Sequence, residues 1–391
     1  MAPRPKFFEF FAGGGMARAG LGEAWECLFA NDSDAMKVAT YAANWGGDHI
    51  LLEDVARLST ASLPGRADLV WASFPCQDLS LAGDYRGLGK ASSAVRTRSG
   101  TFWPFWRLVK ALIAADRAPR LIVLENVTGA LTSNGGKDFA AIGQALSDAR
   151  YRFGAMVIDA RRFLPQSRPR VFFVAVRHGE QIPARLHAAE PDATWRPPAL
   201  VAAQSGLSAA ALKDWVWWRL ARPSARNAVF ADLIEEQPTG VRWRTAEETR
   251  YLMSLMSEVN LRKVEEAKKL GRRVVGGVYR RTRADENGEK RQRAEVRFDD
   301  VAGCLRTPAG GSSRQTIMVV DGENVRSRLL SAREAARLMG LDDSYALPRR
   351  YNDAYHVCGD GVAVPVVRHI AEHILWPILQ ANPTGMMIAA E

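Results

Sequence analysis

Short apolar runs that end in polar or glycine-rich turns recur along the first 180 residues of this chain. Between these runs lie stretches with helical character, and such alternation is typical of strands that are followed by helices. The runs predict strands near 7–11, 27–30, 69–73, 121–124, 155–159 and 171–176. A chain that alternates in this way forms a mostly parallel sheet with helices on both faces, so we predict an α/β fold.

Two apolar periodicities near the C-terminus predict helices. One runs from Arg328 to Met339 and the other from Val364 to Leu379. Pro365 falls in the first turn of the second helix, where proline is tolerated, whereas Pro377 is expected to end or kink it. No internal repeat accompanies these helices.

The middle of the chain has a different pattern. The proline-rich stretch from Pro191 to Pro198 predicts a linker, and the aromatic cluster Trp215-Val216-Trp217-Trp218 predicts a core contribution. Asn287-Gly288 is a turn signal, and it predicts a hairpin between strands at 274–282 and 294–298.

Charge is concentrated in the same middle region. Thirteen Lys and Arg residues stand against six Asp and Glu residues between Arg262 and Arg297. Such a stretch is either a solvated face or a surface for a polyanion. The polar glycine loop 307–314 lies just beyond it, and its backbone and side-chain donors suit the reading of base edges in a groove.

Composition narrows the class of protein. The chain has 391 residues and a formal net charge of +10, which leaves room for two domains and suits a polyanionic partner. No stretch approaches 18 uninterrupted apolar residues, and the N-terminus lacks the apolar core of a signal peptide. The four cysteines show no metal or disulfide spacing, which favours a reducing, cytoplasmic location and no metal site; they are Cys27, Cys76, Cys304 and Cys358.

A glycine turn follows the first predicted strand. Ala12-Gly13-Gly14-Gly15 separates the strand from a helical stretch, and this order begins a nucleotide-binding βαβ unit. Asp32 follows about 20 residues later, the separation at which a carboxylate accepts hydrogen bonds from ribose hydroxyls. The turn lacks the G-x-G-x-x-G pattern, which argues against a dinucleotide, and a glycine turn without a ligand stays possible.

Phe74-Pro75-Cys76-Gln77 is the most informative short motif. It follows the apolar run 68–73, and α/β sheets place their chemistry at the carboxyl ends of parallel strands. Pro75 stiffens the turn that carries the thiol of Cys76. Taken alone, a cysteine here is more often inert packing than a nucleophile.

Six motifs in order give the chain a family resemblance. It resembles the C5-cytosine-specific DNA methyltransferases of prokaryotic type across residues 7–375, with only the segment between about 178 and 327 outside the resemblance. The motifs are Phe11-Ala12-Gly13-Gly14-Gly15, Phe74-Pro75-Cys76-Gln77, Leu124-Glu125-Asn126-Val127, Gln166-Ser167-Arg168-Pro169-Arg170, the run from Ser331 to Gly340, and the run from Tyr355 to Val362.

The resemblance implies a reaction and its residues. Cys76 would add to C6 of cytosine, and C5 would then accept a methyl group from S-adenosylmethionine, leaving S-adenosylhomocysteine. Glu125 would donate a proton at N3 if a dry pocket keeps it protonated, and Asn126 would orient the pocket. Arg168 and Arg170 occupy alternate positions of a strand, so one would face the base and the other the DNA backbone.

The resemblance also implies a cofactor site at the N-terminal half of the sheet and in the last motif. The cofactor-binding residues would be Phe11, Gly13, Gly15, Asp32, Asp54, Val55, Pro75, Phe102, Asp360, Gly361 and Val362. Two positions depart from the family pattern. Asp360 stands where the family commonly has Asn, and Ser33 stands where an aromatic residue is frequent, but neither departure removes a catalytic group.

Double-stranded DNA is the expected partner, and the target cytosine must be flipped out of the stack. The region 79–101 would form a closing loop, and 179–327 a smaller inserted target-recognition domain between a catalytic domain at 1–178 and returning helices at 328–391. The expected DNA-binding residues are Lys90, Arg96, Arg98, Gln166, Arg280, Arg281, Arg306 and Arg314.

Three other functions fit the sequence less well than this one. An RNA C5-methyltransferase on the same scaffold tends to have a smaller recognition segment than the roughly 150 residues here. A non-enzymatic DNA-binding protein would not need Cys76, Glu125 and Arg168, and a dehydrogenase would need G-x-G-x-x-G. The sequence does not give the recognition site or tell whether a restriction endonuclease accompanies the enzyme, which we expect to be a monomer.

Overall fold

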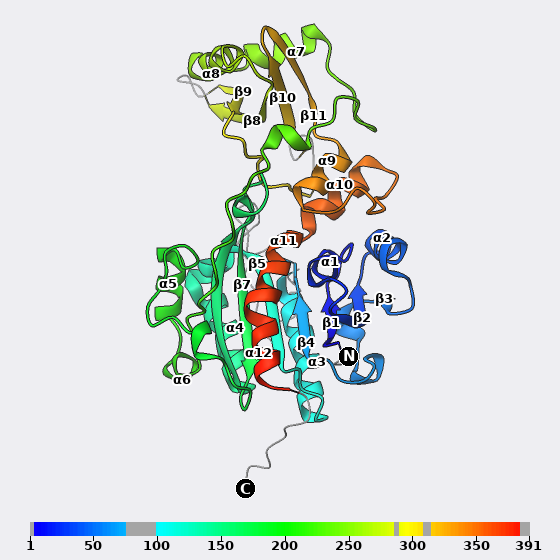
Figure 1. Ribbon diagram of the computed structural model, residues 1–391, viewed down its shortest axis with the longest axis vertical. Coiled ribbons are helices and arrows are strands. Elements are labelled where there is room, and N and C mark those ends of the chain that lie inside the picture. The colour runs from blue at the N-terminus through cyan, green and yellow to red at the C-terminus, as the bar shows by residue number, and fades with distance from the viewer. Residues whose placement is uncertain (1–3, 76–98, 285–288, 308–313, 384–391) are drawn as a thin grey trace. The chain divides into compact units, whose positions relative to one another are not determined.

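The computed structural model describes residues 4–75, 99–284, 289–307 and 314–383 (Figure 1). The chain forms two compact units, each built from discontinuous segments. Unit 1 consists of Met1–Asp159, Pro169–Pro223 and Val364–Glu391, and unit 2 of Ala160–Arg168 and Ser224–Ala363. These limits differ from the expected boundaries, because residues 179–223 belong to unit 1 and residues 328–363 to unit 2.

Unit 1 is built on a seven-stranded sheet in the order β3-β2-β1-β4-β5-β7-β6. Six of its strands run in one direction, and β7 is antiparallel to both of its neighbours, so the predicted mostly parallel sheet is confirmed. The strands are β1 (Lys6–Phe10), β2 (Glu26–Asp32), β3 (Ile50–Leu52), β4 (Leu69–Ala72), β5 (Leu121–Val127), β6 (Tyr151–Asp159) and β7 (Pro169–Arg177).

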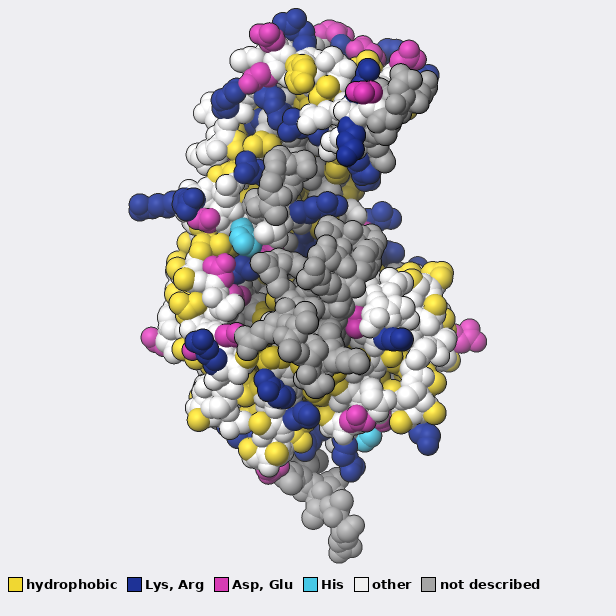
Figure 2. Space-filling view, turned by 180° about the vertical axis from the view of Figure 1, so that it is seen from behind, with side chains coloured by type: hydrophobic (Ala, Val, Ile, Leu, Met, Phe, Trp, Pro, Cys, Tyr) yellow, Lys and Arg dark blue, Asp and Glu magenta, His cyan; other side chains and the backbone are white. Residues whose placement is uncertain are grey.

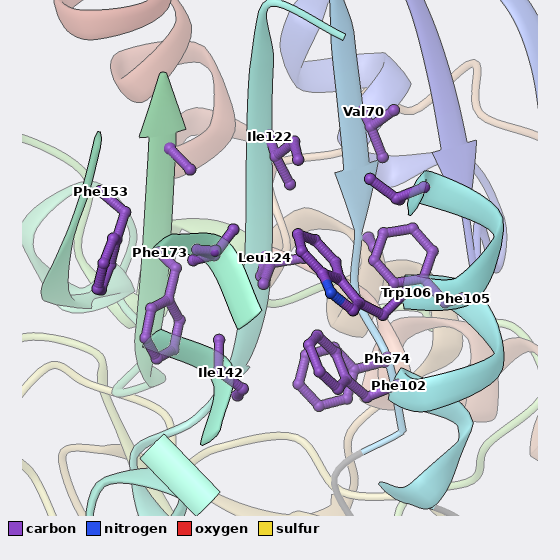
Figure 3. Packing of buried hydrophobic residues seen from close by; sticks show 14 of the residues in the cluster. Val70, Phe74, Phe102, Phe105, Trp106, Ile122, Leu124, Ile142, Phe153 and Phe173 are labelled. Atoms are coloured by element: carbon purple, nitrogen blue, oxygen red, sulfur yellow. The ribbon is translucent and has the colours of Figure 1, made fainter. Parts of the chain in front are cut away.

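Helices pack against both faces of this sheet (Figure 1). They are α1 (Met16–Leu21), α2 (Ala35–Trp45), α3 (Phe102–Ala114), α4 (Lys137–Asp148), α5 (Pro198–Ser205), α6 (Ala209–Lys213), α11 (Val364–Ile370) and α12 (Trp376–Ala381). Figure 3 shows how Phe102, Phe105 and Trp106 of α3 meet Val70 of β4 and Leu124 of β5 in one buried cluster. This packing fixes the carboxyl ends of β4 and β5, where the motifs lie.

The stretch from Pro191 to Pro198 is not a linker. Trp195 is fully buried, its indole N–H donates to the carbonyl of Leu220 at 2.9 Å, and its own carbonyl accepts from Val157 of β6. Because the indole and the backbone are both held, the stretch packs on unit 1 rather than joining two units. The neighbouring Trp218 is also fully buried, which confirms that the aromatic cluster is core.

The C-terminal helix differs from prediction at its proline. Instead of ending near Pro377, the helix passes through a π-helical turn, Ala371–Leu375, and continues as α12. Proline clashes with the carbonyl four residues earlier, and that residue, His373, lies in the wider turn, which relieves the clash. In the described part of the chain, one helical stretch, Tyr351–Ala381, is long and apolar enough to span a membrane, and 67% of its apolar window is buried, as in a core helix.

Unit 2 contains a four-stranded antiparallel sheet in the order β11-β10-β8-β9. The predicted hairpin is confirmed as the pair β8 and β9, and the Asn287-Gly288 turn lies outside the described residues. Helices α7 and α8 contact the sheet through a small apolar cluster. The elements are β8 (Val274–Ala284), β9 (Lys290–Arg297), β10 (Thr316–Asp321), β11 (Asn324–Leu329), α7 (Ala246–Ser254), α8 (Glu258–Lys268), α9 (Ala332–Leu338) and α10 (Tyr351–Asp360).

The helix predicted from Arg328 to Met339 begins later than expected. Arg328 belongs to β11, and α9 begins after Ser331, whose hydroxyl accepts from the N–H of Glu334 in a capping box. Arg328 and Glu334 are fully buried and pair at 2.6 Å, so the arginine is drawn into the interior rather than onto a helix surface. A serine followed three residues later by glutamate is a helix-start signal that outweighs the apolar period.

Gly20 provides a test of how the C-terminal segment joins unit 1. A Cβ at this position would lie 2.4 Å from Cβ of Val367 and 2.7 Å from the carbonyl oxygen of Val364, so α1 and α11 touch through a bare backbone. We expect Gly20→Ala to lower the free energy of unfolding by about 1–3 kcal/mol, the usual cost of overpacking. Gly47→Ala is the control, because a Cβ there meets nothing within 4 Å. Equal thermal midpoints for the two variants would contradict this packing.

Candidate active site

The turn after β1 is shaped by backbone conformations that favour glycine. Phe11, Gly13 and Gly15 have φ values of 56°, 55° and 78°. A Cβ on Gly13 would meet nothing within 4 Å, whereas one on Gly15 would lie 2.3 Å from the indole nitrogen of Trp45. The turn therefore leaves open space at Gly13 and packs closely at Gly15.

Asp32 closes this turn from the end of β2. One of its oxygens accepts from the N–H of Gly13 at 2.9 Å and the other from the N–H of Asp34 at 3.0 Å. Each carboxylate oxygen has two lone pairs, so both retain an acceptor site for hydroxyl groups. An open glycine turn beside a carboxylate with spare acceptor capacity fits an adenosyl ligand with a ribose diol.

Asp54 and Val55 are placed by the edge of the sheet. Leu52 of β3 pairs with Asp32 of β2, and the next residues turn into a short 3₁₀-helix, Val55–Arg57, which Asp54 caps through the N–H of Ala56. Val55 is buried. The predicted residues Asp32, Asp54 and Val55 therefore gather at the carboxyl ends of adjacent strands.

Glu9 is a buried carboxyl that the motif analysis missed. It lies in the middle of β1 with 1% of its surface exposed, and within the described residues its Oε2 has no hydrogen-bond partner. Burial raises its pKa to about 8, although the Arg18 charge and the N–H groups of Arg18 and Ala17 oppose the shift. The signal for it was an acidic residue inside the run Phe7–Phe11, under the glycine turn.

Glu125 and Arg170 meet on adjacent strands. Glu125 is in β5 and Arg170 in β7, and the Nε of Arg170 lies 3.2 Å from a carboxylate oxygen of Glu125. Glu125 is 6% exposed, so the ion pair is largely shielded from water. The guanidinium of Arg170 thereby orients the carboxyl group of Glu125.

Asn126 joins the ends of two strands. Its side-chain amide donates to the carbonyl of Phe74 at 3.1 Å, and its oxygen accepts from the N–H of Val127. Phe74 is itself buried, with its ring centroid 5.4 Å from that of Phe102. The chain entering the nucleophile motif is therefore held as far as Phe74; Cys76 lies outside the described residues.

Arg168 and Arg170 fall into different units, because unit 2 includes residues 160–168 and β7 begins at Pro169. The guanidinium of Arg168 is buried and donates to the carbonyls of Leu305 and Gly359 at 3.1 and 2.8 Å. The side chain therefore fastens backbone segments of unit 2. Its expected contact with base or DNA stays a prediction.

Asp360, expected at the cofactor, has its own partners within unit 2. Its carboxylate accepts from the hydroxyl of Thr307 and lies 3.0 Å from the Nε2 of His356. Gly361 follows at the end of α10, and Val362 is buried. The structure thus ties the last motif to the residues that precede the glycine loop, whose positions 308–313 lie outside the described residues.

The candidate DNA-binding residues occupy varied surroundings. Gln166 is fully buried, and its amide donates to the carbonyl of Leu338, which fits a structural role. Arg280 and Arg281 are exposed on β8. The face of unit 2 that Figure 2 presents carries numerous Lys and Arg side chains. Lys90, Arg96 and Arg98 lie outside the described residues, whereas Arg306 is exposed and Arg314 is half-buried.

Comparison with known proteins decides the family. The model of the C-5 cytosine-specific DNA methylases matches residues 5–376. The chain belongs to this family. Its activity is the methylation of cytosine at C5 in DNA, and the chemistry of such methyltransferases depends on S-adenosylmethionine.

Two curated relatives of this methylase match over nearly their whole length. The type II methyltransferase M.NlaX of Neisseria lactamica is 26% identical over 375 residues, covering 94% of this chain and 96% of the relative. The type II methyltransferase M.HpaII of Haemophilus parainfluenzae is 25% identical over 392 residues, covering 94% and 88%.

Solved structures share the fold of this methylase. The Dnmt2 methyltransferase of S. pombe superposes with a TM-score of 0.58 at 16% identity, covering 96% of this chain and 99% of that one. A putative DNA modification methyltransferase encoded in an E. coli prophage superposes with a TM-score of 0.52 at 18% identity, with the same coverage. These likenesses confirm the methyltransferase α/β fold.

The buried carboxyl of Glu9 gives the methylase a specific dependence of stability on pH. Because its pKa rises from about 4.5 to about 8 on folding, the native state holds a proton that the unfolded chain releases between these values. The free energy of unfolding therefore falls as pH rises through this window, by about 1.4 kcal/mol per pH unit at most. We expect Glu9→Gln to remove this contribution, so that the variant gains stability relative to the parent from pH 5 to pH 8.

Denaturant titrations at several pH values measure this difference. Glu23→Gln is the control, because Glu23 is exposed and its neutralisation leaves no buried group unpaired. A constant stability difference between Glu9→Gln and the parent across the window would contradict a protonated Glu9.

Proposed function

We propose that this methylase acts through a covalent bond between the sulfur of Cys76 and C6 of a cytosine flipped out of double-stranded DNA. The observation that carries the proposal is the ion pair of Glu125 with Arg170, buried beside the Asn126 tie to Phe74. Glu125 would handle the proton at the end of β5. The next residue, Asn126, holds the carbonyl of Phe74, where the Cys76 motif begins after β4. Cytosine C5 is a poor nucleophile until a group has added at C6, so both features serve one reaction.

The thiol of Cys76 would pass its proton through Glu125 to N3 while its sulfur forms a bond to C6, so the ring gains no net charge. C5 would then form a bond to the methyl carbon as the bond from that carbon to the sulfonium sulfur breaks. A water molecule would take the proton from C5, and the electrons of that C–H bond would expel the sulfur of Cys76. The proton on N3 would return to this sulfur, which restores the aromatic ring.

Cys27 and Cys358, two of the three cysteines in the described part of the chain, are poor competitors for this role. Burial raises the pKa of Cys27 and that of Cys358 to about 12, so both remain thiols at neutral pH. A thiol is not the nucleophilic form of cysteine. Cys304 lies beside the guanidinium of Arg168 within unit 2, and its sulfur is 3.6 Å from an arginine nitrogen.

S-Adenosylmethionine would bind at the glycine turn and the edge formed by β2 and β3. Asp32 would accept hydrogen bonds from the ribose, Gly13 would allow the ligand to approach the backbone, and Asp54 with Val55 would meet the adenine. Phe11, Gly15, Pro75 and Phe102 would complete the site on the strand side, and Asp360, Gly361 and Val362 would contribute from the last motif. The bound cofactor supplies an electrophilic methyl group.

Unit 2 would recognise the target sequence, and the basic face of β8 would hold the DNA backbone. Arg281 and Arg293 are exposed and lie opposite each other on adjacent strands, and the carboxylate of Glu295 lies 4.0 Å from the Nε of Arg281. Because two cations share this one nearby carboxylate, phosphates would add the anions that balance the second charge. A partner endonuclease that cuts the same sequence would not need to bind this monomeric enzyme, because the two activities meet only on DNA.

Covalent trapping tests the nucleophile. We expect duplex DNA that carries 5-fluorocytosine at the target to form an adduct that survives denaturing electrophoresis, because fluorine does not leave as a proton does. Cys76→Ala should abolish the adduct and methyl transfer while DNA binding persists. Cys27→Ser should retain both, as the control. Turnover of Cys76→Ala within tenfold of the parent would refute the covalent route.

Cofactor binding tests the role of Asp32. We expect Asp32→Asn to weaken the binding of S-adenosylmethionine by about 1–3 kcal/mol, the cost of lost hydrogen bonds to a charged group. Asp34→Asn is the matched control, because asparagine still caps α2 and removes the same charge two residues away. Calorimetry would count against the ribose role if both variants bound the cofactor as the parent does.

A further inference from the structure

Arg306 is an exposed arginine, and hydrogen bonds and close packing hold the backbone around it. It lies in unit 2 between Leu305, which is 1% exposed, and Thr307. In the described part of the chain its guanidinium makes no hydrogen bond or ion pair, although the residues on both sides of it are tied down. Such an arginine has a fixed backbone and a side chain that is available to bind a ligand outside the chain.

The first tie comes from Arg168. Its two terminal nitrogens donate separately, one to the carbonyl of Leu305 at 3.1 Å and the other to the carbonyl of Gly359 at 2.8 Å. The guanidinium is planar and rigid, so it holds the residue before Arg306 at a fixed distance from the end of α10.

The second tie comes from Asp360 at the end of the same helix. Its carboxylate accepts from the hydroxyl of Thr307, and His356 one turn earlier lies 3.0 Å from the other oxygen. Between the two ties, Gly359 touches the backbone directly, since a Cβ there would lie 2.8 Å from the carbonyl carbon of Arg306. Arg168, Gly359 and Asp360 thus form a three-point backbone clamp around Arg306.

The neighbouring arginines are held differently. Arg314 is half-buried, with its guanidinium 5.9 Å from the centre of the Tyr351 ring, and among the described residues its buried Nε has no hydrogen-bond partner. Its side chain is therefore engaged in packing within unit 2. Arg281 is exposed on β8 opposite Arg293, and its Nε lies 4.0 Å from the carboxylate of Glu295, so its side chain already has an ionic partner within unit 2.

We propose that Arg306 reads the edge of a guanine in the target sequence and that the backbone clamp sets its aim. The inference rests on the proposed function, because it assigns a specificity residue to unit 2. The guanidinium fork matches the two acceptors of guanine in the major groove. A clamped backbone lowers the conformational entropy that Arg306 loses on binding. Discrimination between bases then depends on the geometry of the Arg306 side chain.

The test determines which sequences are methylated. The parent and four variants are expressed in a bacterial host that lacks cytosine methylation, and 5-methylcytosine is mapped across the genome by sequencing. We expect Arg306→Ala to keep methylating while it loses its preference for G·C at one position of the motif, by roughly tenfold to a hundredfold. Arg306→Lys should relax the same position, because a lysine keeps the charge and lacks the fork.

Variants of Thr307 test the backbone clamp independently of the Arg306 side chain. Thr307→Val removes the hydroxyl at nearly constant volume, so we expect partial relaxation of the same motif position, whereas Thr307→Ser keeps the hydroxyl and should methylate as the parent does. A merely structural role would lower methylation at all sites alike and leave the motif intact.

Two outcomes would overturn the proposal. If Arg306→Ala and Arg306→Lys lose activity without a change of motif, Arg306 is a phosphate contact. If the motif relaxes in the Arg306 variants and Thr307→Val matches Thr307→Ser, the clamp does not set its aim. Failure of the proposed covalent route is separate, since the parent would then form no adduct with 5-fluorocytosine DNA, whatever motif it methylates.

Discussion

The hydrogen bond from the side chain of Asn126 to the carbonyl of Phe74 is the contact on which the candidate active site depends. It joins the carboxyl ends of β5 and β4, two neighbours in the parallel sheet, at the point where both leave their ladders. Because Glu125 precedes Asn126 and the nucleophile motif begins at Phe74, one bond fixes the carboxyl-bearing strand end relative to the first residue of that motif. The aromatic packing of Phe74 and Phe102 keeps that bond away from water.

Several parts of this arrangement could be read from the sequence. Six of the seven strands of unit 1, all but β3, and the β8–β9 hairpin follow from local signals, because apolar runs and turn residues are properties of a few neighbouring positions. The place of Arg170 beside Glu125 was not predicted, because it depends on the register of two strands far apart in the chain. The cysteine itself is assigned by its motif alone.

Other features depended on contacts between distant residues. The start of α9 moved to Ser331 because Arg328 is drawn toward Glu334 in the interior, and the stretch around Trp195 packs on β6 although its prolines suggest a linker. The pKa of Glu9 rises only because the sheet buries its carboxyl group. The boundary of the two units separates Arg168 from Arg170, although they are two positions apart. None of these outcomes is encoded in local periodicity.

The interleaving of the two units has a consequence for synthesis of the protein. Helix α11 packs on α1 through Gly20, so the first helix of the chain receives this partner only after more than 360 residues have been made. Contacts so distant in sequence slow folding, because a long loop must close before they form. On the ribosome, unit 1 would wait with an incomplete surface while unit 2 finishes, and chains truncated before Val364 would be substrates for chaperones and proteases rather than partly active enzymes.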